Sequence, residues 1–284
     1  MALATFAAMS LRTLIEMALA EDLGEAGDIT TMATVPADQS GTGRVVAKQA
    51  LVVSGTAVIA ATFEALGGAQ VTLHHHDGER VEKGALVAEI KGPLRTLLSG
   101  ERVMLNLLMH CCGIATLTRQ AADALAGTQT RVLDTRKTTP LLRALEKAAV
   151  RDGGGTNHRF GLGDGILIKD NHITAAGSVT RAITQARAAA HHLLKIECEV
   201  SSTAQIDEAL AAGADILLLD NMNDQQLTEA VERIGTKAQT EASGNMTVAR
   251  LPGVGRTGVS FVSMGALTHS APAADLSMKI DAGF

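Results

Sequence analysis

The chain has 284 residues, with 25 basic against 30 acidic side chains and a formal net charge of −5 at neutral pH. This length exceeds a common single domain of about 100 to 150 residues, so one large α/β domain or two domains is expected. The absence of Trp and Tyr, with only five Phe, predicts an aliphatic core and argues against a nucleic-acid groove built on base stacking. We therefore expect small-molecule partners and no nucleic acid.

The cysteines and the N-terminus bear on the compartment. Cys111 and Cys112 are adjacent and Cys198 is distant, which fits neither a metal motif nor a disulfide framework and favours a reducing, cytoplasmic setting. The apolar N-terminus lacks the basic segment of a signal peptide, and residues 11–19 repeat at helical spacing, so we predict an amphipathic helix. No run reaches the roughly 18 apolar residues of a membrane span, so no membrane partner is expected.

The first third of the chain predicts a small sheet. Glycines and acidic residues in 21–31 indicate a loop, and residues 43–92 alternate short β-rich runs with Asp-Gly and Lys-Gly turns. This pattern predicts a mostly antiparallel sheet with one helix near 57–66.

Three consecutive histidines, His74 to His76, suggest a metal site. Successive strand residues point to opposite faces, so at most two could reach one ion. We interpret them as a polar strand end beside the Asp77-Gly78 turn.

A long helix is predicted from Arg95 to Ala126, mostly apolar. Glu101 and Arg102 interrupt the apolar run, and an arginine there must be paired or solvated. Local sequence leaves two interpretations open for Arg102, a salt bridge with Glu101 or a ligand contact.

Beyond Thr130 short apolar strands alternate with helices, which predicts parallel strands with right-handed crossovers. About six strands can be counted, against eight in a full (β/α)8 barrel, so an open, incomplete barrel is expected. The strands are RVLD, GILIKD, KIECEV, ADILLLD, AQTEAS and GVSFVSMG, and the helices lie near 141–150, 178–190, 203–212 and 223–235.

Each predicted strand ends in polar residues, and in βα barrels these ends share the face that carries the active site. The strand-end residues are Asp134 with Arg136 and Lys137, Lys169 with Asp170, Glu199, Asp220, Glu241 with Ser243, and Ser263 with Gly265.

Residue types suggest the chemistry of this face. Glu199 and Asp220 could hold magnesium or sugar hydroxyls, because both take hard oxygen ligands. Residues 241–247 and 263–266 resemble late-strand loops that bind phosphate through backbone N–H groups. The cationic groups that could face carboxylates or a second phosphate are Arg102, Arg136, His158, Arg159 and Lys169.

Two features of the basic segment 134–172 and its surroundings favour a simpler interpretation. Arg143, Lys147 and Arg151 are spaced by four in a helical run, which is typical of a solvated helix face. The sequence GVGRTG at 253–258 matches a dinucleotide fingerprint, but it precedes a strand instead of joining a strand to a helix. We discard it.

The chain resembles the quinolinate phosphoribosyltransferase family. The segment DTRKTTPLLRALEKAAVRDGGGTNHRFGLGDGILIKDNH is followed by EVSSTAQIDEALAAGADILLLDNM, EASG and GALTHS, which resemble the family's motifs in order. EDLGEAGDIT and ERVMLNLL resemble its N-terminal part, so the resemblance covers nearly the whole chain.

The resemblance implies an N-terminal α/β sandwich, residues 1–112, followed by an open α/β barrel, residues 113–284, with the tail from about 268 a candidate to pack back onto the sandwich. It also implies a homodimer, with further assembly open, in which Arg102 enters the neighbouring subunit's active site. Quinolinate and phosphoribosyl pyrophosphate would be the substrates, with Mg²⁺, and nicotinate mononucleotide, pyrophosphate and CO2 the products of this step in NAD biosynthesis.

Site residues follow position by position from the resemblance. Arg102, Arg136, His158, Arg159 and Lys169 would hold the quinolinate carboxylates, and Thr135, Lys137, Glu199 and Asp220 would hold phosphoribosyl pyrophosphate and its magnesium. Ser243, Gly244, Asn245, Met264, Gly265, Ala266 and His269 would hold the 5-phosphate. Lys137, Lys169, Glu199 and Asp220 are the catalytic candidates.

The phosphate loop departs from the family at Asn245, where a second glycine is usual. Asparagine tolerates left-handed backbone angles better than most residues, so we expect the loop to remain competent.

Three alternatives stay open at this stage. One is a paralogous barrel of the same family associated with molybdate transport, whose substrate is uncertain. Another is a Schiff-base aldolase using Lys169, which follows the apolar strand GILI. The third is a non-catalytic binder of dicarboxylates.

Overall fold

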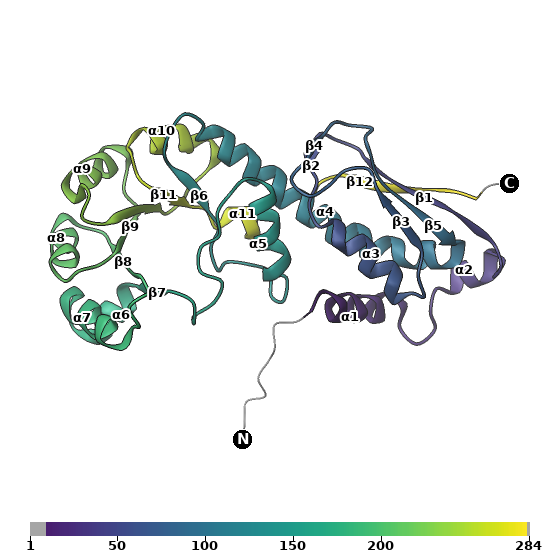
Figure 1. Ribbon diagram of the computed structural model, residues 1–284, viewed down its shortest axis with the longest axis horizontal. Coiled ribbons are helices and arrows are strands. Elements are labelled where there is room, and N and C mark those ends of the chain that lie inside the picture. Colours follow the sequence, from purple (N-terminus) through teal and green to yellow (C-terminus); the bar gives the residue numbers. More distant parts are fainter. Residues whose placement is uncertain (1–9, 283–284) are drawn as a thin grey trace, which may run out of the picture. The chain divides into compact units, whose positions relative to one another are not determined.

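The structure is a computed structural model that describes residues 10–282. It forms two compact units, shown as a ribbon in Figure 1. One comprises the residues up to 117, the segment 139–154 and the residues from 271 onward, and the other comprises 118–138 and 155–270.

The first unit is built on a four-stranded antiparallel sheet in the order β12-β1-β5-β3. A two-stranded ribbon, β2 with β4, accompanies it. Strands and helices run as follows: α1 Leu11–Leu23, α2 Ile29–Thr34, β1 Ser40–Ala47, β2 Leu51–Val52, α3 Thr56–Ala65, β3 Gln70–Leu73, β4 Arg80–Val81, β5 Leu86–Pro93, α4 Leu94–Ala124, α5 Arg143–Asp152 and β12 Leu276–Asp281. The last residues of α4, from Thr118, belong to the second unit.

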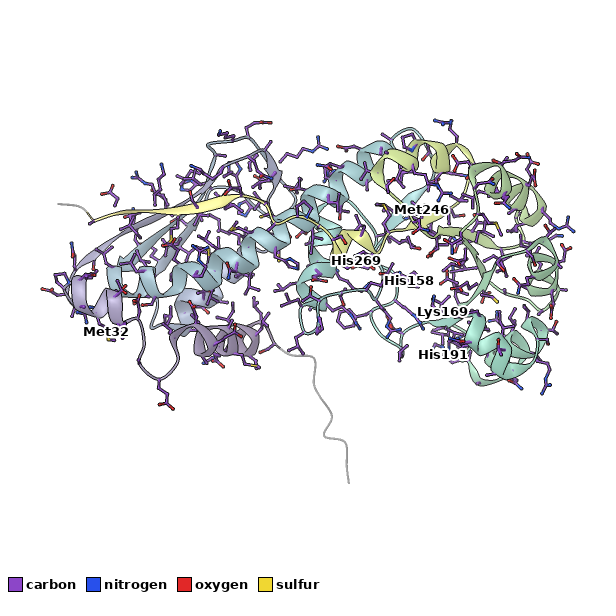
Figure 2. All side chains as sticks on the ribbon, turned by 180° about the vertical axis from the view of Figure 1, so that it is seen from behind. Met32, His158, Lys169, His191, Met246 and His269 are labelled. Atoms are coloured by element: carbon purple, nitrogen blue, oxygen red, sulfur yellow. The ribbon has the colours of Figure 1, made fainter. Side chains whose placement is uncertain are left out.

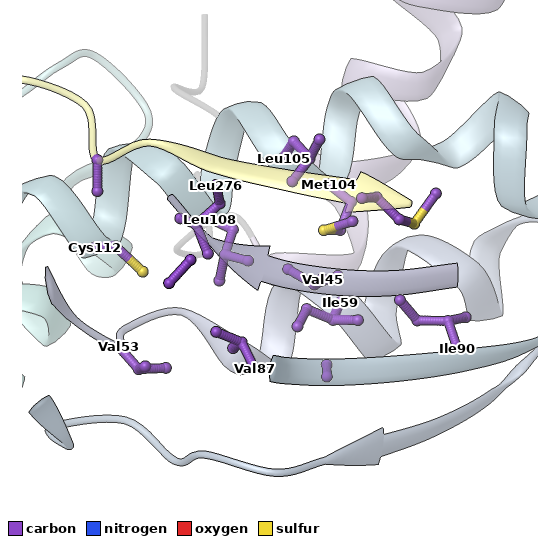
Figure 3. Packing of buried hydrophobic residues seen from close by; sticks show 14 of the residues in the cluster. Val45, Val53, Ile59, Val87, Ile90, Met104, Leu105, Leu108, Cys112 and Leu276 are labelled. Carbon is purple, nitrogen blue, oxygen red and sulfur yellow. The ribbon is translucent and has the colours of Figure 1, made fainter. Parts of the chain in front are cut away.

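The core of the first unit is aliphatic, as the composition predicts. In Figure 3 side chains from β1, β5, α3, α4 and β12 converge, among them Val45, Ile59, Ile90, Leu108 and Leu276. Helix α4 supplies much of this core, which explains its apolar sequence. Arg102 projects from its exposed side.

The predicted N-terminal helix is confirmed as α1, which buries Ile15 and Leu19. The prediction of a loop over 21–31 is partly wrong, since α1 continues to Leu23 and α2 begins at Ile29. The acidic residue that suggested a loop instead caps α2, because the Asp28 side chain accepts a hydrogen bond from the Thr31 backbone N–H at 2.9 Å.

The histidines lie just beyond β3, at the strand end that we predicted. His74 contacts Glu89 at 3.3 Å and His75 contacts Glu79 at 2.9 Å. His74 and His75 therefore each contact a different carboxylate on the surface. The three histidines do not belong to the metal-compatible cluster found in the described part of the chain.

Helix α5 corrects one prediction. Arg151 is exposed and Arg143 half-buried, but Lys147 is buried with 2% of its surface exposed. The neighbouring Glu146 is fully buried and binds His110 Nε2 at 2.8 Å and the Thr139 backbone N–H. The prediction of a solvated face is therefore wrong for Lys147, although it holds for the exposed Arg151.

The second unit contains the six parallel strands expected of an open barrel. Their order is β6-β11-β10-β9-β8-β7, so the sheet is open, with β6 and β7 as its outermost strands. Beyond β6, Thr156 forms a short parallel bridge with Leu133. The strands are β6 Arg131–Leu133, β7 Ile166–Ile168, β8 Ile196–Val200, β9 Ile216–Asp220, β10 Gln239–Ser243 and β11 Phe261–Ser263. The helices are α6 Asp170–Ala176, α7 Val179–Ala189, α8 Thr203–Ala211, α9 Asp224–Ile234, η1 Val248–Arg250, α10 Leu251–Arg256 and α11 Ala266–His269.

The GVGRTG segment is confirmed not to be a dinucleotide-binding turn, because its first residues lie inside α10 instead of in a strand-to-helix turn. None of the helices in residues 10–282 is long and apolar enough to cross a membrane.

One glycine of α4 makes a close approach that can be tested. A Cβ on Gly113 would lie 2.1 Å from the Pro272 carbonyl oxygen, whereas one on Gly100 would meet only the side chains of Leu66 and Phe63. We predict that Gly113→Ala destabilises the protein by about 1–3 kcal/mol, although alanine ordinarily gains about 1 kcal/mol in a helix. Urea unfolding would measure this. Gly100→Ala is the matched control, and equal midpoints for both variants would contradict the prediction.

Candidate active site

A cavity of about 660 Å³ lies at the carboxyl ends of the barrel strands. It gathers side chains from β9 and β10 and from the segments after β6, β7 and β11. The predicted residues that line it are Thr135, Lys137, Lys169, Glu199, Asp220, Ser243, Gly244, Asn245, Met264, Gly265, Ala266 and His269. Segments 134 residues apart in the chain, from Thr135 to His269, thus line one cavity.

An adjoining cavity of about 310 Å³ shares Lys137 and Lys169 with the first. It adds Arg136, His158 and Arg159, together with the apolar side chains of Leu167 and Leu218. In Figure 2 the labelled His158, Lys169 and His269, from three different segments, lie near one another. The smaller cavity therefore combines several cations with an apolar wall, which suits an aromatic acid.

Arg102 is not among the residues that line either cavity. It is exposed on α4, and no contact is found between it and Glu101 in the described residues. Of the two interpretations left open for Arg102, the salt bridge with Glu101 is not found among the described residues, and the ligand contact stays a prediction.

Lys169 lines both the larger and the smaller cavity. Its Nζ atom binds Glu199 Oε2 at 2.8 Å, with 47% of the lysine side chain exposed. Its backbone is fixed because the Lys169 N–H donates to His172 Nδ1 at 2.9 Å at the start of α6. This ion-paired, exposed lysine lacks the apolar surroundings that a Schiff-base lysine requires.

The loop after β10 has the left-handed geometry that we expected Asn245 to tolerate. Gly244 has φ 98° and Asn245 has φ 48°. A Cβ on Gly244 would lie 2.2 Å from Asn221 Oδ1, so only glycine fits. Arg250 fixes the loop by donating from Nη1 to the Gly244 carbonyl oxygen at 3.3 Å.

The loop after β11 positions Lys137. A Cβ on Gly265 would lie 2.9 Å from Lys137 Cδ, and Thr268 Oγ1 donates to the Lys137 carbonyl oxygen at 2.8 Å. The lysine therefore lies along a bare stretch of backbone next to the N-terminus of α11, where N–H groups are available to an anion.

The guanidinium groups of the smaller cavity lie close to one another. Burial, and then repulsion from Arg136, lower the pKa of Arg159 below its ordinary value. Arg159 Nη1 donates to the Gly165 carbonyl oxygen at 3.0 Å. A pair of cations held together in this way is stabilised when a dianion binds between them.

Sequence reasoning missed a buried cluster below this cavity. His158 Nε2 lies 3.0 Å from Glu197 Oε2 and 3.6 Å from Glu241 Oε2, and both glutamates are buried. Burial, and then repulsion from Glu197, raise the pKa of Glu241 to about 8. Glu241 was noted only as a strand-end residue, and Glu197 not at all. The signal was available, since Glu197 and Glu199 alternate in IECEV and so point to the same face of the strand.

A third buried carboxylate, Asp134, orients the cluster from the side. Asp134 is fully buried at the end of β6 and accepts from the His158 backbone N–H at 2.9 Å and from Asn157 Nδ2 at 2.5 Å. The same turn lets the Arg159 N–H donate to His158 Nδ1 at 2.7 Å. This contact makes Nδ1 an acceptor, so the neutral ring carries its proton on Nε2.

Together these features define a class of protein: an open α/β-barrel enzyme whose cavity binds phosphorylated and carboxylated substrates. Transfer of a phosphorylated sugar needs cations, loops that a phosphate can approach closely, and acids. The cavity contains such cations, two glycine-bearing loops, and the paired acids Glu199 and Asp220.

Comparisons with known proteins define the class further. Family models match both parts of the chain: "Quinolinate phosphoribosyl transferase, N-terminal domain" over residues 28–112 and "Quinolinate phosphoribosyl transferase, C-terminal domain" over residues 114–279. The chain belongs to the quinolinate phosphoribosyltransferase family.

Individual relatives agree over nearly the full length. The probable nicotinate-nucleotide pyrophosphorylase [carboxylating] of Bacillus subtilis is 45% identical, covering 96% of this chain and 94% of the relative. That of Mycobacterium leprae is 43% identical, covering 95% and 96%. The crystal structure of NadC from Streptococcus pyogenes superposes with a TM-score of 0.92 at 41% identity, covering 98% and 99%.

The backbone geometry of Asn245 yields a prediction. We expect Asn245→Val to destabilise the protein by about 1–2 kcal/mol, because a β-branched residue is strained at positive φ. Asn245→Gly should leave stability almost unchanged, because glycine adopts that conformation freely. Chemical unfolding compares the two variants with the parent. If the valine variant matched the glycine variant, the left-handed conformation at this position would be refuted.

Proposed function

We propose a division of roles among the cavity residues for this chain's nicotinate-nucleotide pyrophosphorylase (carboxylating) activity, in which quinolinate takes the smaller cavity and phosphoribosyl pyrophosphate the larger. The observation that carries the proposal is that the two cavities adjoin and share Lys137 and Lys169. An aromatic dicarboxylate and a phosphorylated sugar must meet at one bond, and adjoining cavities allow this.

Quinolinate binding falls to the cations around the apolar wall. Arg136, Arg159 and Lys169 hold the two carboxylates, and the ring lies against Leu167 and Leu218. His158 borders the same cavity, but its Nδ1 accepts from Arg159 N–H and its Nε2 faces Glu197. It therefore acts on the substrate by fixing the turn that carries Arg159, instead of by adding a charge.

Phosphoribosyl pyrophosphate occupies the larger cavity. The 5-phosphate lies against the loops Ser243 to Asn245 and Met264 to Ala266, with His269 beside it. The Met264 N–H already donates to the Leu133 carbonyl oxygen at 2.9 Å, so the following residues of that loop offer the N–H groups. Thr135 and Lys137 face the pyrophosphate, while Glu199 and Asp220 face the ribose.

Glu199 and Asp220 suit a magnesium ion bound together with the substrate. They end neighbouring parallel strands, with Glu199 opposite Leu218 and Asp220 two residues further along. Two carboxylates are too few for a complete protein site, but Mg²⁺ commonly takes only one or two and completes its shell with water and substrate phosphates. When bound, the ion would neutralise charge that develops on the leaving pyrophosphate.

The chemistry needs no protein nucleophile. The pyridine nitrogen of quinolinate attacks C1 of the ribose as the C1–O bond to pyrophosphate breaks, and Lys137 stabilises the leaving oxygens. The ring nitrogen is then positively charged. The bond from C2 to its carboxylate breaks next, because the adjacent cationic nitrogen stabilises the electron pair left on C2.

We further propose that the active unit is a homodimer, with Arg102 of one subunit completing the quinolinate site of the other. The exposed position of Arg102 on a helix that is largely buried supports this. The three cysteines of this chain are buried free thiols. Burial raises the pKa of the Cys112 thiol to about 12. Free thiols of this kind support our proposal of a reducing, cytoplasmic setting.

The role of Lys137 can be tested directly. We predict that Lys137→Ala lowers kcat by about 10² to 10³-fold, because a charge that stabilises the leaving group is lost, while the thermal unfolding curve is unchanged. Glu199→Ala should lose activity to a similar extent. Lys83→Ala, at an exposed lysine of the first unit, is the matched control. Activity of Lys137→Ala close to that of Lys83→Ala would refute the assignment.

The shared site can be tested by subunit mixing. Arg102→Ala and Lys137→Ala homodimers should both be nearly inactive. If Arg102 acts across the interface, a mixed dimer has one site with both defects and one intact site, so unfolding and refolding an equal mixture should restore about a quarter of the parent activity. No recovery, with mixed dimers present by mass spectrometry, would place Arg102 in the site of its own chain.

A further inference from the structure

Glu241 forms part of the floor of the quinolinate cavity. It comes from the middle of β10, two residues before Ser243, and lines the smaller cavity together with Leu167, Leu218 and Lys169. Only 2% of the residue is exposed. A carboxyl group in this position, in the cavity proposed to hold an aromatic dicarboxylate, has no obvious role in binding an anion.

The cluster around Glu241 leaves polar atoms unsatisfied. Oε1 of Glu197 and Oε1 of Glu241 are both buried and have no hydrogen-bond partner among the described residues. The single Nε2–H of His158 is nearer to Glu197, at 3.0 Å, than to Glu241, at 3.6 Å. Two buried carboxylates that share one ring N–H, with only the Ser263 hydroxyl as a further donor to Glu241, are stable only if a further proton or a cation is present.

A metal ion would be one solution, because one atom each of His158, Glu197 and Glu241 lies within 4.8 Å of the others. The histidine disfavours it. Nδ1 accepts from the Arg159 N–H, so the ring proton is on Nε2, the atom that faces the two acids. Binding a metal through Nε2 would require that proton to move to Nδ1, and the contact of Nδ1 with the Arg159 N–H would then be lost. A proton held by the two acids requires no such change.

Glu241 is the acid that holds this proton. Burial, and then repulsion from Glu197 on β8, raise its pKa to about 8, partly offset by His158 and by the Ser263 hydroxyl on β11. The neighbouring strand β9 presents the uncharged Leu218 to the same cavity, and the other charged groups lining it are Arg136, Lys137, Arg159 and Lys169. At neutral pH Glu241 is therefore a neutral acid in a cavity that otherwise holds cations.

We propose that Glu241 is the general acid of the decarboxylation step, donating its proton to C2 of the pyridinium ring. This rests on the sequence of steps proposed above. The C2–carboxylate bond breaks, carbon dioxide leaves, and the electron pair on C2 takes the proton as the Glu241 O–H bond breaks. The resulting carboxylate regains a proton from water after product leaves, so one proton is consumed per turnover.

A second cavity offers a route by which Glu241 can be protonated again. Glu241, Glu197 and His158 also border a cavity of about 270 Å³ lined by the first residues of several strands, among them Ile166, Ile216 and Phe261. The cluster thus lies between the substrate cavity and a separate opening at the other end of the strands. Water can reach the spent carboxylate from there.

A single-turnover experiment separates the two chemical steps. Enzyme in excess is mixed with carboxyl-labelled quinolinate, phosphoribosyl pyrophosphate and Mg²⁺, and pyrophosphate, labelled carbon dioxide and nicotinate mononucleotide are followed. For Glu241→Gln we expect pyrophosphate release within about 3-fold of the parent, but nicotinate mononucleotide formation about 10²-fold slower, the usual contribution of a general acid. Quinolinate mononucleotide should accumulate, because a carbanion that is not protonated recaptures carbon dioxide.

The pH dependence provides a readout that a purely structural role would not change. The acid form is needed, so in the parent the rate of nicotinate mononucleotide formation should fall as pH rises through about 8, and this limb should be absent in Glu241→Gln. Glu241→Asp keeps the acid and should retain the limb at a lower rate, which also serves if the glutamine variant fails to fold. Glu229→Gln, at an exposed glutamate of α9, is the matched control.

Two outcomes would overturn the proposal. One is equal slowing of pyrophosphate release and nicotinate mononucleotide formation in Glu241→Gln, which would make Glu241 part of the binding floor only. The other is an unchanged rate of nicotinate mononucleotide formation. Loss of pyrophosphate release in the parent itself would instead refute the proposed steps, so the two failures are distinguishable.

Discussion

The cationic cavity depends on buried negative charge below it. Asp134 is fully buried and binds the backbone of the turn that carries His158 and Arg159, and Glu197 holds the His158 ring from the opposite side. Without these acids, the repulsion between Arg136 and Arg159 would be offset less, with Asp164 as a remaining negative charge that acts on Arg159. Because the carboxylates are fixed by hydrogen bonds, the cations are positioned before any anion arrives, and binding need not reorganise them.

The parallel register of the sheet decides which acids face the substrates and which lie below. Residues two apart on a strand share a face, so β8 places Glu197 and Glu199 in line, at successive depths. The deeper acid meets His158 and the shallower one meets Lys169. The same holds on β10 for Glu241 and Ser243. One strand geometry thus supplies a buried layer and a ligand-facing layer.

Sequence alone predicted the barrel, its six strands and the polar strand ends, because apolar runs of fixed length and glycine-bounded helices are local signals. The left-handed conformation at Asn245 could be accepted from the sequence for the same reason, because tolerance of positive φ is a local property of the residue. Lys147 shows the limit. Its spacing along α5 predicts a solvated face, but burial is decided by what packs against a helix, and α5 belongs to the first unit although it lies between two barrel strands in the chain.

The buried cluster of His158, Glu197 and Glu241 could not be predicted from the sequence for a related reason. Glu197 and Glu241 are 44 residues apart, and each by itself reads as an ordinary polar residue in a strand. Their effect on each other depends on β9 separating them by one strand while both point inward. Burial, and then repulsion from Glu197, raise the pKa of Glu241 to about 8. A property of this kind belongs to the contact and not to either residue, so only the folded chain reveals it.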